Sequence, residues 1–296
     1  MVTASAPGKV ILFGEHAVVY GEPAIAGAID LRIRVRAEKT AKSLKITSET
    51  KDHRYVEKAV DVVFEHLGEA TGLMIDISSD LPPASGLGSS AAVSVATIAA
   101  VANLLGHDLG KNEIARLGYK VELGVQGAAS PTDTYTTTHG GIQYIQPRKK
   151  GFTPIQASLP LVVGYTGIER STKELVAGVR KLRDAYPELV SPLIKNIGMV
   201  TRQARKSLEA GEDVGDLMNI NHGLLEALGV SNDALSRLVH ASREAGARGA
   251  KLTGAGGGGC MIAYTPGRYR DVINAIEGCG STAMKAAISA EGVRLE

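Results

Sequence analysis

Hydrophobic and polar residues follow two different periodicities along this chain. Leu31–Arg36 alternates apolar and basic residues, which predicts a strand with one polar face. Tyr55–Leu67 instead spaces Val56, Val60 and Val63 at helical intervals, which predicts an amphipathic helix. The same reasoning predicts further strands at 10–13, 24–29, 44–47, 73–78, 141–145, 159–165, directly before 254, at 260–264 and near 292–295, and further helices at 89–105, 111–125, 172–185, 189–210, 214–228, 233–244 and 269–277.

The order of these elements indicates the fold class. Strands and helices are mixed instead of alternating as βαβ units, which favours an α+β fold over a doubly wound parallel sheet. Residues 89–105 are apolar nearly all round, so we expect this helix in the interior. Charged residues with Pro and Gly interrupt the strands at about 147–158, so we place a domain boundary there, between residues 1–152 and 153–296.

Composition excludes several classes of protein. The 296 residues carry a formal net charge of +2, which gives no electrostatic reason to expect a nucleic acid or a membrane surface as partner. There is no Trp and there are three Phe, too few for a stacking platform for single strands. Cys260 and Cys279 have neither metal-site nor disulfide-framework spacing, and no segment resembles a targeting signal. We therefore expect a soluble, cytoplasmic protein with reduced thiols.

The glycines cluster, and one cluster runs directly into the helix predicted at 89–105. In Leu81–Ala92, glycines permit a tight turn whose backbone N–H groups face outward, and the helix beyond adds unpaired donors and its positive dipole end. Ser89 and Ser90 add hydroxyls where a Mg²⁺ bridging nucleotide phosphates would lie. The alternative is an ordinary helix cap, since Ser is a favoured N-cap residue. The P-loop pattern is absent, because neither Gly8-Lys9 nor Gly110-Lys111 is followed by Ser or Thr.

Two glycine runs match the dinucleotide-binding pattern by letter only. Gly254–Gly259 matches G-x-G-x-x-G, but a predicted strand follows it where the fingerprint requires a helix. Gly86–Ala91 matches the variant ending in Ala, but Pro82-Pro83 precedes it, which is a poor end for a central strand. We therefore reject a Rossmann interpretation, and a dinucleotide-dependent oxidoreductase is retained only as the alternative class.

Three separated segments, at 7–21, 82–92 and 251–260, together resemble the three motifs of the GHMP kinase superfamily, in the same order. This superfamily includes galactokinases and the homoserine, mevalonate and phosphomevalonate kinases. The versions at 14–21 and 253–260, and the segment 171–176, resemble the mevalonate kinase branch. The resemblance implies two domains, an ATP-binding N-terminal one like domain 2 of ribosomal protein S5 and a ferredoxin-like C-terminal one, with the active site in the cleft between them.

The resemblance also implies an activity, which is ATP-dependent phosphorylation of the 5-hydroxyl of mevalonate to give 5-phosphomevalonate. Its partners would be mevalonate and Mg-ATP, with Mg²⁺ as cofactor, no nucleic acid and no membrane, and a homodimer as candidate assembly. Another GHMP kinase remains the alternative within the class; a phosphorylated acceptor would call for further cations, such as Arg170, Lys173 or Arg202. An inactive binding relative is the third reading.

The catalytic and metal-binding roles map onto four positions. Asp133 matches the catalytic aspartate that would accept or orient the proton of the attacking hydroxyl, although by itself it reads as a turn cap beside Pro131. Lys9 would lie near Asp133 and favour the developing alkoxide; its alternative is a solvated lysine. Glu122 and Ser90 match the Mg²⁺ ligands, and the alternative for Glu122 is a surface glutamate.

The remaining site residues fall into two groups. The ATP phosphates would be bound by Pro83, Ala84, Ser85, Gly86, Leu87, Gly88, Ser89, Ser90 and Ala91. The acceptor would be bound by Glu15, His16, Thr138, Thr166, Gly254 and Ala255. The alternatives are a satisfied core histidine for His16 and ordinary loop hydroxyls for the two threonines. No motif marks the adenine pocket, to which residues 40–54 are the candidate contributors.

Overall fold

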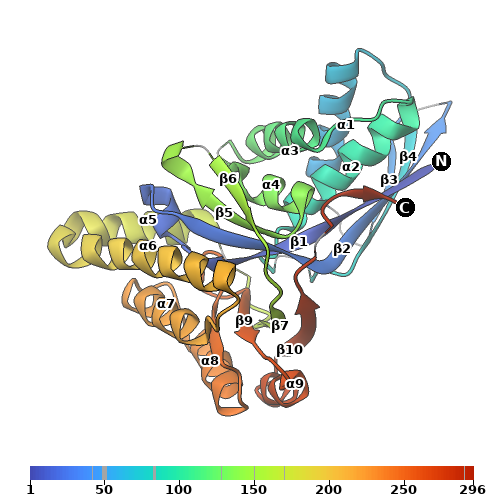
Figure 1. Cartoon of the computed structure of the whole chain (residues 1–296). Coiled ribbons are helices and arrows are strands. Elements are labelled where there is room, and N and C mark those ends of the chain that lie inside the picture. Colours follow the sequence, from blue (N-terminus) through green and yellow to red (C-terminus); the bar gives the residue numbers. More distant parts are fainter. Residues whose placement is uncertain are drawn as a thin grey trace.

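The computed structural model describes the chain except for residues 42, 49–51, 83–84, 128, 150, 170 and 290. Pro83 and Ala84, two of the predicted phosphate contacts, and the alternative cation Arg170 therefore lie outside the described residues. The described residues form two sheets, each with its own helices (Figure 1).

The first sheet is built on a long antiparallel pair, β1 (Val2–Phe13) and β2 (Ala24–Thr40). Its order is β11-β1-β2-β4-β3, and β5 pairs with β2 and with β6. The other members are β3 (Lys45–Thr47), β4 (Gly72–Ser79), β5 (Ile142–Gln146), β6 (Gly151–Ile155) and β11 (Arg294–Leu295). The pairing register shifts between Pro7 and Gly8, as expected where a proline interrupts a ladder.

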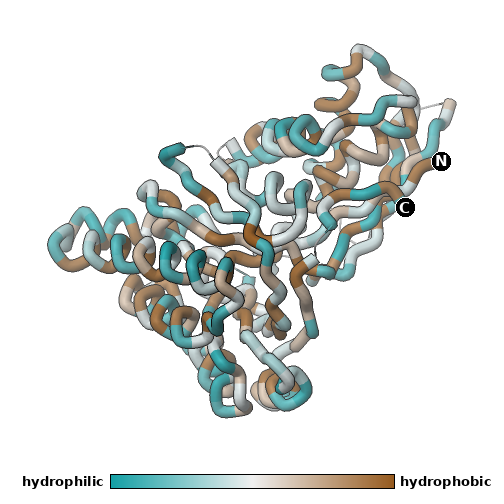
Figure 2. Tube along the Cα trace, in the orientation of Figure 1, coloured by the Kyte–Doolittle hydropathy of each residue, from teal (hydrophilic) through white to brown (hydrophobic). Residues whose placement is uncertain are grey.

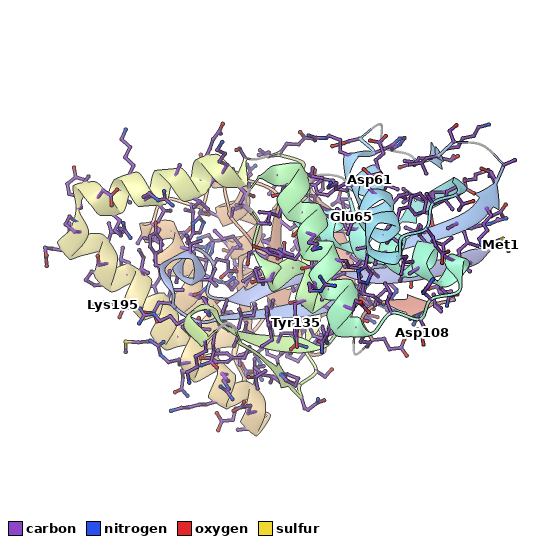
Figure 3. The ribbon with its side chains drawn as sticks, turned by 90° about the horizontal axis from the view of Figure 1, so that it is seen from above. Met1, Asp61, Glu65, Asp108, Tyr135 and Lys195 are labelled. Carbon is purple, nitrogen blue, oxygen red and sulfur yellow. The ribbon has the colours of Figure 1, made fainter. Side chains whose placement is uncertain are left out.

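Helix α2 (Ser89–Leu105) packs directly against β1 and β2, together with α4 (Pro131–His139). Its alanine-rich sequence allows this close approach, and the prediction of an interior helix is confirmed because most of its residues are buried. The helices α1 (Arg54–Leu67) and α3 (Lys111–Gln126) pack on α2. Figure 3 shows Asp61 and Glu65 on the outer side of α1, away from the sheet.

The second sheet has the antiparallel order β10-β7-β9-β8, with β7 (Pro160–Tyr165), β8 (Gly249–Leu252), β9 (Cys260–Tyr264) and β10 (Thr282–Ala287). Its helices are α5 (Thr172–Ala185), α6 (Pro187–Ala210), α7 (Gly215–Ala227), α8 (Asp233–Glu244) and α9 (Tyr269–Gly278). Along α5 to α8 the chain alternates between hydrophilic and hydrophobic within each turn, as expected for helices with one buried face (Figure 2).

The two sheets are joined in several places. Helix α6 contacts β1, β2 and the 3-10 helix η1 (Ala17–Tyr20), and Ile29 bridges to Ile288. The buried guanidinium of Arg32 donates to the carbonyl of Gly292 at 2.7 Å, and β11 then pairs with β1. The boundary proposed between 152 and 153 falls within β6, and the chain end returns to the first sheet.

The α+β fold class is confirmed, but three elements of the structure were not expected from the sequence. Residues 131–139 form a helix where the sequence suggested a turn, and the strands β6 and β10 were not predicted. Among the described residues, no helix is both long and apolar enough to cross a membrane.

Candidate active site

A cavity of about 1100 Å³ lies where the two halves of the chain meet. Its wall includes the end of β1, the turn before α2, the start of α4, the start of α5 and the loop between β8 and β9. Residues from the three motifs at 7–21, 82–92 and 251–260 therefore line the same cavity. The predicted active site requires these three motifs to meet in space.

Lys9 and Asp133 meet inside this cavity. Ser130 caps α4 by accepting from the Thr132 N–H, and Pro131 occupies the first helical position, so Asp133 lies in the first turn of the helix. Helix α4 packs on β1, which carries Lys9, and Lys9 Nζ lies 3.1 Å from Asp133 Oδ2. Lys9 is 6% exposed and is not the solvated lysine of the alternative reading. The pair joins a cation and a carboxylate at the cavity wall.

The turn before α2 supports both Lys9 and a prospective anion. The Lys9 N–H donates to the carbonyl of Leu87 at 2.8 Å, which holds the turn against β1. Gly88 caps the helix with φ 78°, and a Cβ on it would lie 2.8 Å from Lys9 Cγ, so only glycine fits here without displacing the lysine. The cavity is lined by Ser85, Gly86, Gly88, Ser89 and Ser90, next to the unpaired N–H groups that begin α2.

Glu122 faces the same point from α3. Its side chain accepts a hydrogen bond from Ser90 Oγ at 2.9 Å, and the residue is 4% exposed. Burial, followed by the nearby Asp133 carboxylate, raises the pKa of Glu122 to about 7. Burial and the Asp133 charge disfavour the ionised form of Glu122, and a nearby cation would favour it. A carboxylate together with a hydroxyl is a donor set that suits Mg²⁺.

The described residues contain no group of three or more His, Cys, Asp or Glu side chains arranged to hold a metal ion. A nucleotide-dependent Mg²⁺ site takes one or two protein carboxylates and completes its shell with phosphate oxygens and water. The Ser90 and Glu122 oxygens therefore fit Mg²⁺ only together with a bound nucleotide.

The other end of the cavity is formed by the segment after β1 and by the loop from β8 to β9. His16 has φ 59°, and it is the single non-glycine residue with positive φ in the described part of the chain. Its Nε2 donates to the carbonyl of Ala255 at 2.8 Å, so the ring is held against the second half of the chain. Glu15, His16, Gly254 and Ala255 all line the cavity, so these four predicted acceptor contacts share one wall.

The run Gly254–Gly259 is a connection between two antiparallel strands and does not begin a helix. Thr253 Oγ1 accepts from the Ile11 N–H at 2.9 Å and donates to the Ile11 carbonyl at 3.0 Å, which fastens this connection to β1. A Cβ on Gly256 would lie 1.9 Å from the Val230 carbonyl oxygen, so the loop needs glycine for close approach. The dinucleotide-binding interpretation is thereby excluded for this run.

Four predicted contacts lie away from the cavity wall. Thr138 is buried in α4, and its carbonyl accepts from the Val293 N–H at 3.1 Å. Thr166 Oγ1 donates to the carbonyl of Gly259 at 2.9 Å and thus holds the end of the glycine loop. Leu87 and Ala91 are fully buried and contribute to the core. These four are absent from the set of described residues that line the cavity.

Sequence reasoning missed most of the far end of the cavity. Beyond the α2 turn the wall becomes largely apolar, with a few polar groups such as Ser48, Asp52 and Gln126. Ser48 and Asp52 lie in the 40–54 stretch that was the candidate for the adenine pocket. The described residues at this end are Ile33, Ser48, Asp52, Tyr55, Val56, Ile77, Ser79, Leu81, Val93 and Gln126.

Comparison with known proteins agrees with this geometry. The sequence profile for the GHMP kinases N terminal domain matches residues 54–141, and that for GHMP kinases C terminal matches residues 204–281. The mevalonate kinase of Pyrococcus abyssi is 48% identical over an alignment 329 positions long, gaps included, which covers 100% of this chain and 98% of that protein.

Solved structures give the same relationship. The Methanococcus jannaschii mevalonate kinase superposes with a TM-score of 0.86 at 32% identity, covering 97% of this chain and 98% of that one. The L. major mevalonate kinase in complex with R-mevalonate superposes with a TM-score of 0.88 at 30% identity, covering 96% and 94%. This chain therefore belongs to the mevalonate kinase family and has the two-domain GHMP kinase fold.

Proposed function

We propose that this protein transfers the γ-phosphoryl group of ATP to the 5-hydroxyl of mevalonate, giving 5-phosphomevalonate and ADP. The observation that carries the proposal is the Lys9–Asp133 ion pair, at 3.1 Å, in the cavity that also contains the start of α2 and the Ser90–Glu122 bond. The names of the full-length relatives support mevalonate as the acceptor.

The triphosphate of ATP would lie along Ser85–Ser90. Backbone N–H groups at the start of α2 and the positive end of its dipole favour anions, and the serine hydroxyls add donors. Ser85 Oγ is buried with no hydrogen-bond partner among the described residues, so it is available to a phosphate. The apolar far end, with Tyr55 and Val56 of α1, offers a surface on which a purine base can stack.

Ser90 and Glu122 would hold Mg²⁺ together with phosphate oxygens of the nucleotide. When bound, the ion neutralises charge that develops on the phosphates during transfer. For this role Glu122 must be ionised, so nucleotide and metal binding would release its proton.

Asp133 would accept the proton of the attacking hydroxyl. In this step the bond from the acceptor oxygen to the γ-phosphorus forms, and the bond to the β–γ bridging oxygen breaks, so ADP leaves with that electron pair. Lys9, held by Asp133, is positioned to stabilise the developing negative charge on the acceptor oxygen and the transferring group. Both side chains are fixed by packed elements, β1 and α4, so the alignment would not depend on a mobile loop.

The charge of the cavity favours an acceptor without a phosphate. Among the described lining residues, Lys9 is the single Lys or Arg. Arg202, an alternative cation, instead donates to Glu22 Oε2 at 2.8 Å and lies outside the lining set, as does Lys173. A phosphorylated acceptor would bring additional negative charge without an additional cation to bind it.

A coupled ADP-release assay with purified protein tests the proposal. Mevalonate, phosphomevalonate, homoserine and galactose would be compared at equal concentrations with Mg-ATP, and with NAD binding measured in parallel. We expect turnover on mevalonate well above the other three. Preferred turnover of another acceptor would refute the assignment of mevalonate, and NAD binding without ATP turnover would favour the oxidoreductase class.

A further inference from the structure

Behind the acceptor end of the cavity lies a buried ion pair that the mechanism above does not use. Lys251, on β8, donates to Glu15 Oε1, and the two side chains are 0% and 1% exposed. Lys251 also donates to its neighbouring Leu252 carbonyl at 2.7 Å. Glu15 reaches the cavity wall, whereas Lys251 is outside the lining set among the described residues. Lys251 can therefore affect a ligand in the cavity only through its ion pair with Glu15.

The second oxygen of Glu15 is also engaged. Asn221, on α7, donates from Nδ2 to Glu15 Oε2 at 3.1 Å, so three elements converge on one carboxylate. The next residue on α7, His222, accepts from the Leu252 N–H at 3.4 Å. Burial lowers the pKa of His222 to about 4, so this ring is neutral near pH 7 and does not alter the charge of the pair. Burial also lowers the pKa of Lys251, and Glu15 opposes that shift.

The balance of charge in the cavity gives this pair a consequence for binding. The charged residues that line it in the described part of the chain are Lys9, Glu15, Asp52, Glu122, Asp133 and Glu169. Acidic side chains therefore dominate a space that must accept a nucleotide triphosphate and, under the proposed function, an acceptor with its own carboxylate. Like charges a few ångströms apart inside a protein repel strongly, because the effective dielectric constant is low.

We propose that Lys251 is a positioning residue of the acceptor site: it cancels the charge of Glu15, so that a carboxylate-bearing acceptor can bind beside that side chain. Asn221 completes the arrangement by donating to the second oxygen of Glu15. The inference rests on the proposed function for the identity of the acceptor. We therefore expect the Glu15–Lys251 pair to control binding of the acceptor and to leave binding of ATP unchanged. Lys251 lies near the acceptor end of the cavity, whereas the purine base would bind at the apolar far end.

The test uses Lys251→Met, which keeps most of the side-chain volume and removes the charge. Initial rates would be measured at the same pH for the parent and every variant. We expect KM for mevalonate to rise by about tenfold or more, equivalent to about 1.4 kcal/mol, while KM for ATP stays within about twofold. Glu15→Gln in the Lys251→Met background removes the uncompensated charge and should therefore lower KM for mevalonate severalfold relative to Lys251→Met alone.

Two further variants keep the proposal falsifiable if Lys251→Met does not fold. Asn221→Asp brings a second carboxylate against Glu15 with the lysine intact and should also raise KM for mevalonate selectively. Arg32→Met is the matched control. It removes a buried cation of β2 that donates to Ser5 and Gly292 and is not among the described residues lining the cavity, so it should lower stability without changing either KM.

The proposal is overturned if Lys251→Met and Asn221→Asp leave KM for mevalonate unchanged. It is also overturned if the double variant shows the same defect as Lys251→Met, because the lysine would then act through packing alone. Failure of the proposed function is distinguishable, since in that case the parent protein itself would not phosphorylate mevalonate.

Discussion

Replacing Glu122 by Gln should make the nucleotide-free protein more stable at high pH. Glu122 is buried beside Asp133, and its pKa in the folded protein is about 7, against an ordinary value of 4.5. Between these two pH values the unfolded chain has lost the proton and the folded chain keeps it. The folded state therefore binds more protons, so the stability of the parent falls as pH rises through this window.

The size of the effect follows from the two pKa values. Each tenfold change in proton affinity corresponds to about 1.4 kcal/mol, so ionised Glu122 destabilises the folded protein by about 3 kcal/mol above pH 7. Gln has no proton to lose and keeps the bond from Ser90 by its amide oxygen. Relative to the parent, the Tm of Glu122→Gln should therefore rise by roughly 6 °C between about pH 4.5 and pH 8.

Thermal unfolding followed by circular dichroism measures this difference, since the chain has no Trp for fluorescence. The matched control is Glu65→Gln, on the exposed outer side of α1 (Figure 3), because it makes the same substitution without removing a buried carboxylate. Adding Mg-ATP at pH 8 should stabilise the parent and should stabilise Glu122→Gln much less. A Tm difference between Glu122→Gln and the parent that stays constant from pH 4.5 to 8 would refute the reasoning.

Three further perturbations address the catalytic end of the cavity. Asp133→Asn should lower kcat by roughly 10²–10⁴ with the protein folded and ATP binding retained, as steady-state kinetics and calorimetry would show; near-parental turnover would remove Asp133 from its role. Ser90→Ala should raise the Mg²⁺ concentration needed for half-maximal rate, and an unchanged Mg²⁺ titration would contradict the metal assignment. Gly88→Ala should lower kcat by about 10- to 100-fold, because the added Cβ would displace the Lys9 side chain. The control Gly110→Ala should leave kcat unchanged, because open space surrounds the added Cβ. Equal kcat values for the two variants would contradict the claim that only glycine fits at position 88.

Much of the fold was predictable because local patterns and tertiary packing agree. The helix at 172–185 has the predicted bounds, and the apolar helix at 89–105 is the interior helix α2. The helix α4 was missed because five of its nine residues are β-branched threonines, which have low helix propensity. The signals for its start were present: Ser130 is followed by Pro131 at the first helical position, with Asp133 in the first turn.

The parts of the site that were predictable are those carried by short motifs. Lys9, Asp133 and Ser90 lie in separate segments, and each was marked by its neighbours along the chain. The Glu15–Lys251 pair gave no such signal, because its members are 236 residues apart and their contact depends on how β1 and β8 are packed. The far end of the cavity was missed for the same reason, since isolated apolar residues from β2, β4 and α1 carry no local pattern that distinguishes a binding wall from a core.

The most direct measurement is a crystal structure of the protein with Mg²⁺, a non-hydrolysable ATP analogue and mevalonate. We expect phosphates along Ser85–Ser90, Mg²⁺ bound by Ser90 and Glu122, and the 5-hydroxyl within about 3 Å of the Asp133 carboxylate and beside Lys9. Nucleotide phosphates or mevalonate bound away from this cavity, or a 5-hydroxyl turned away from Asp133 and Lys9, would contradict it.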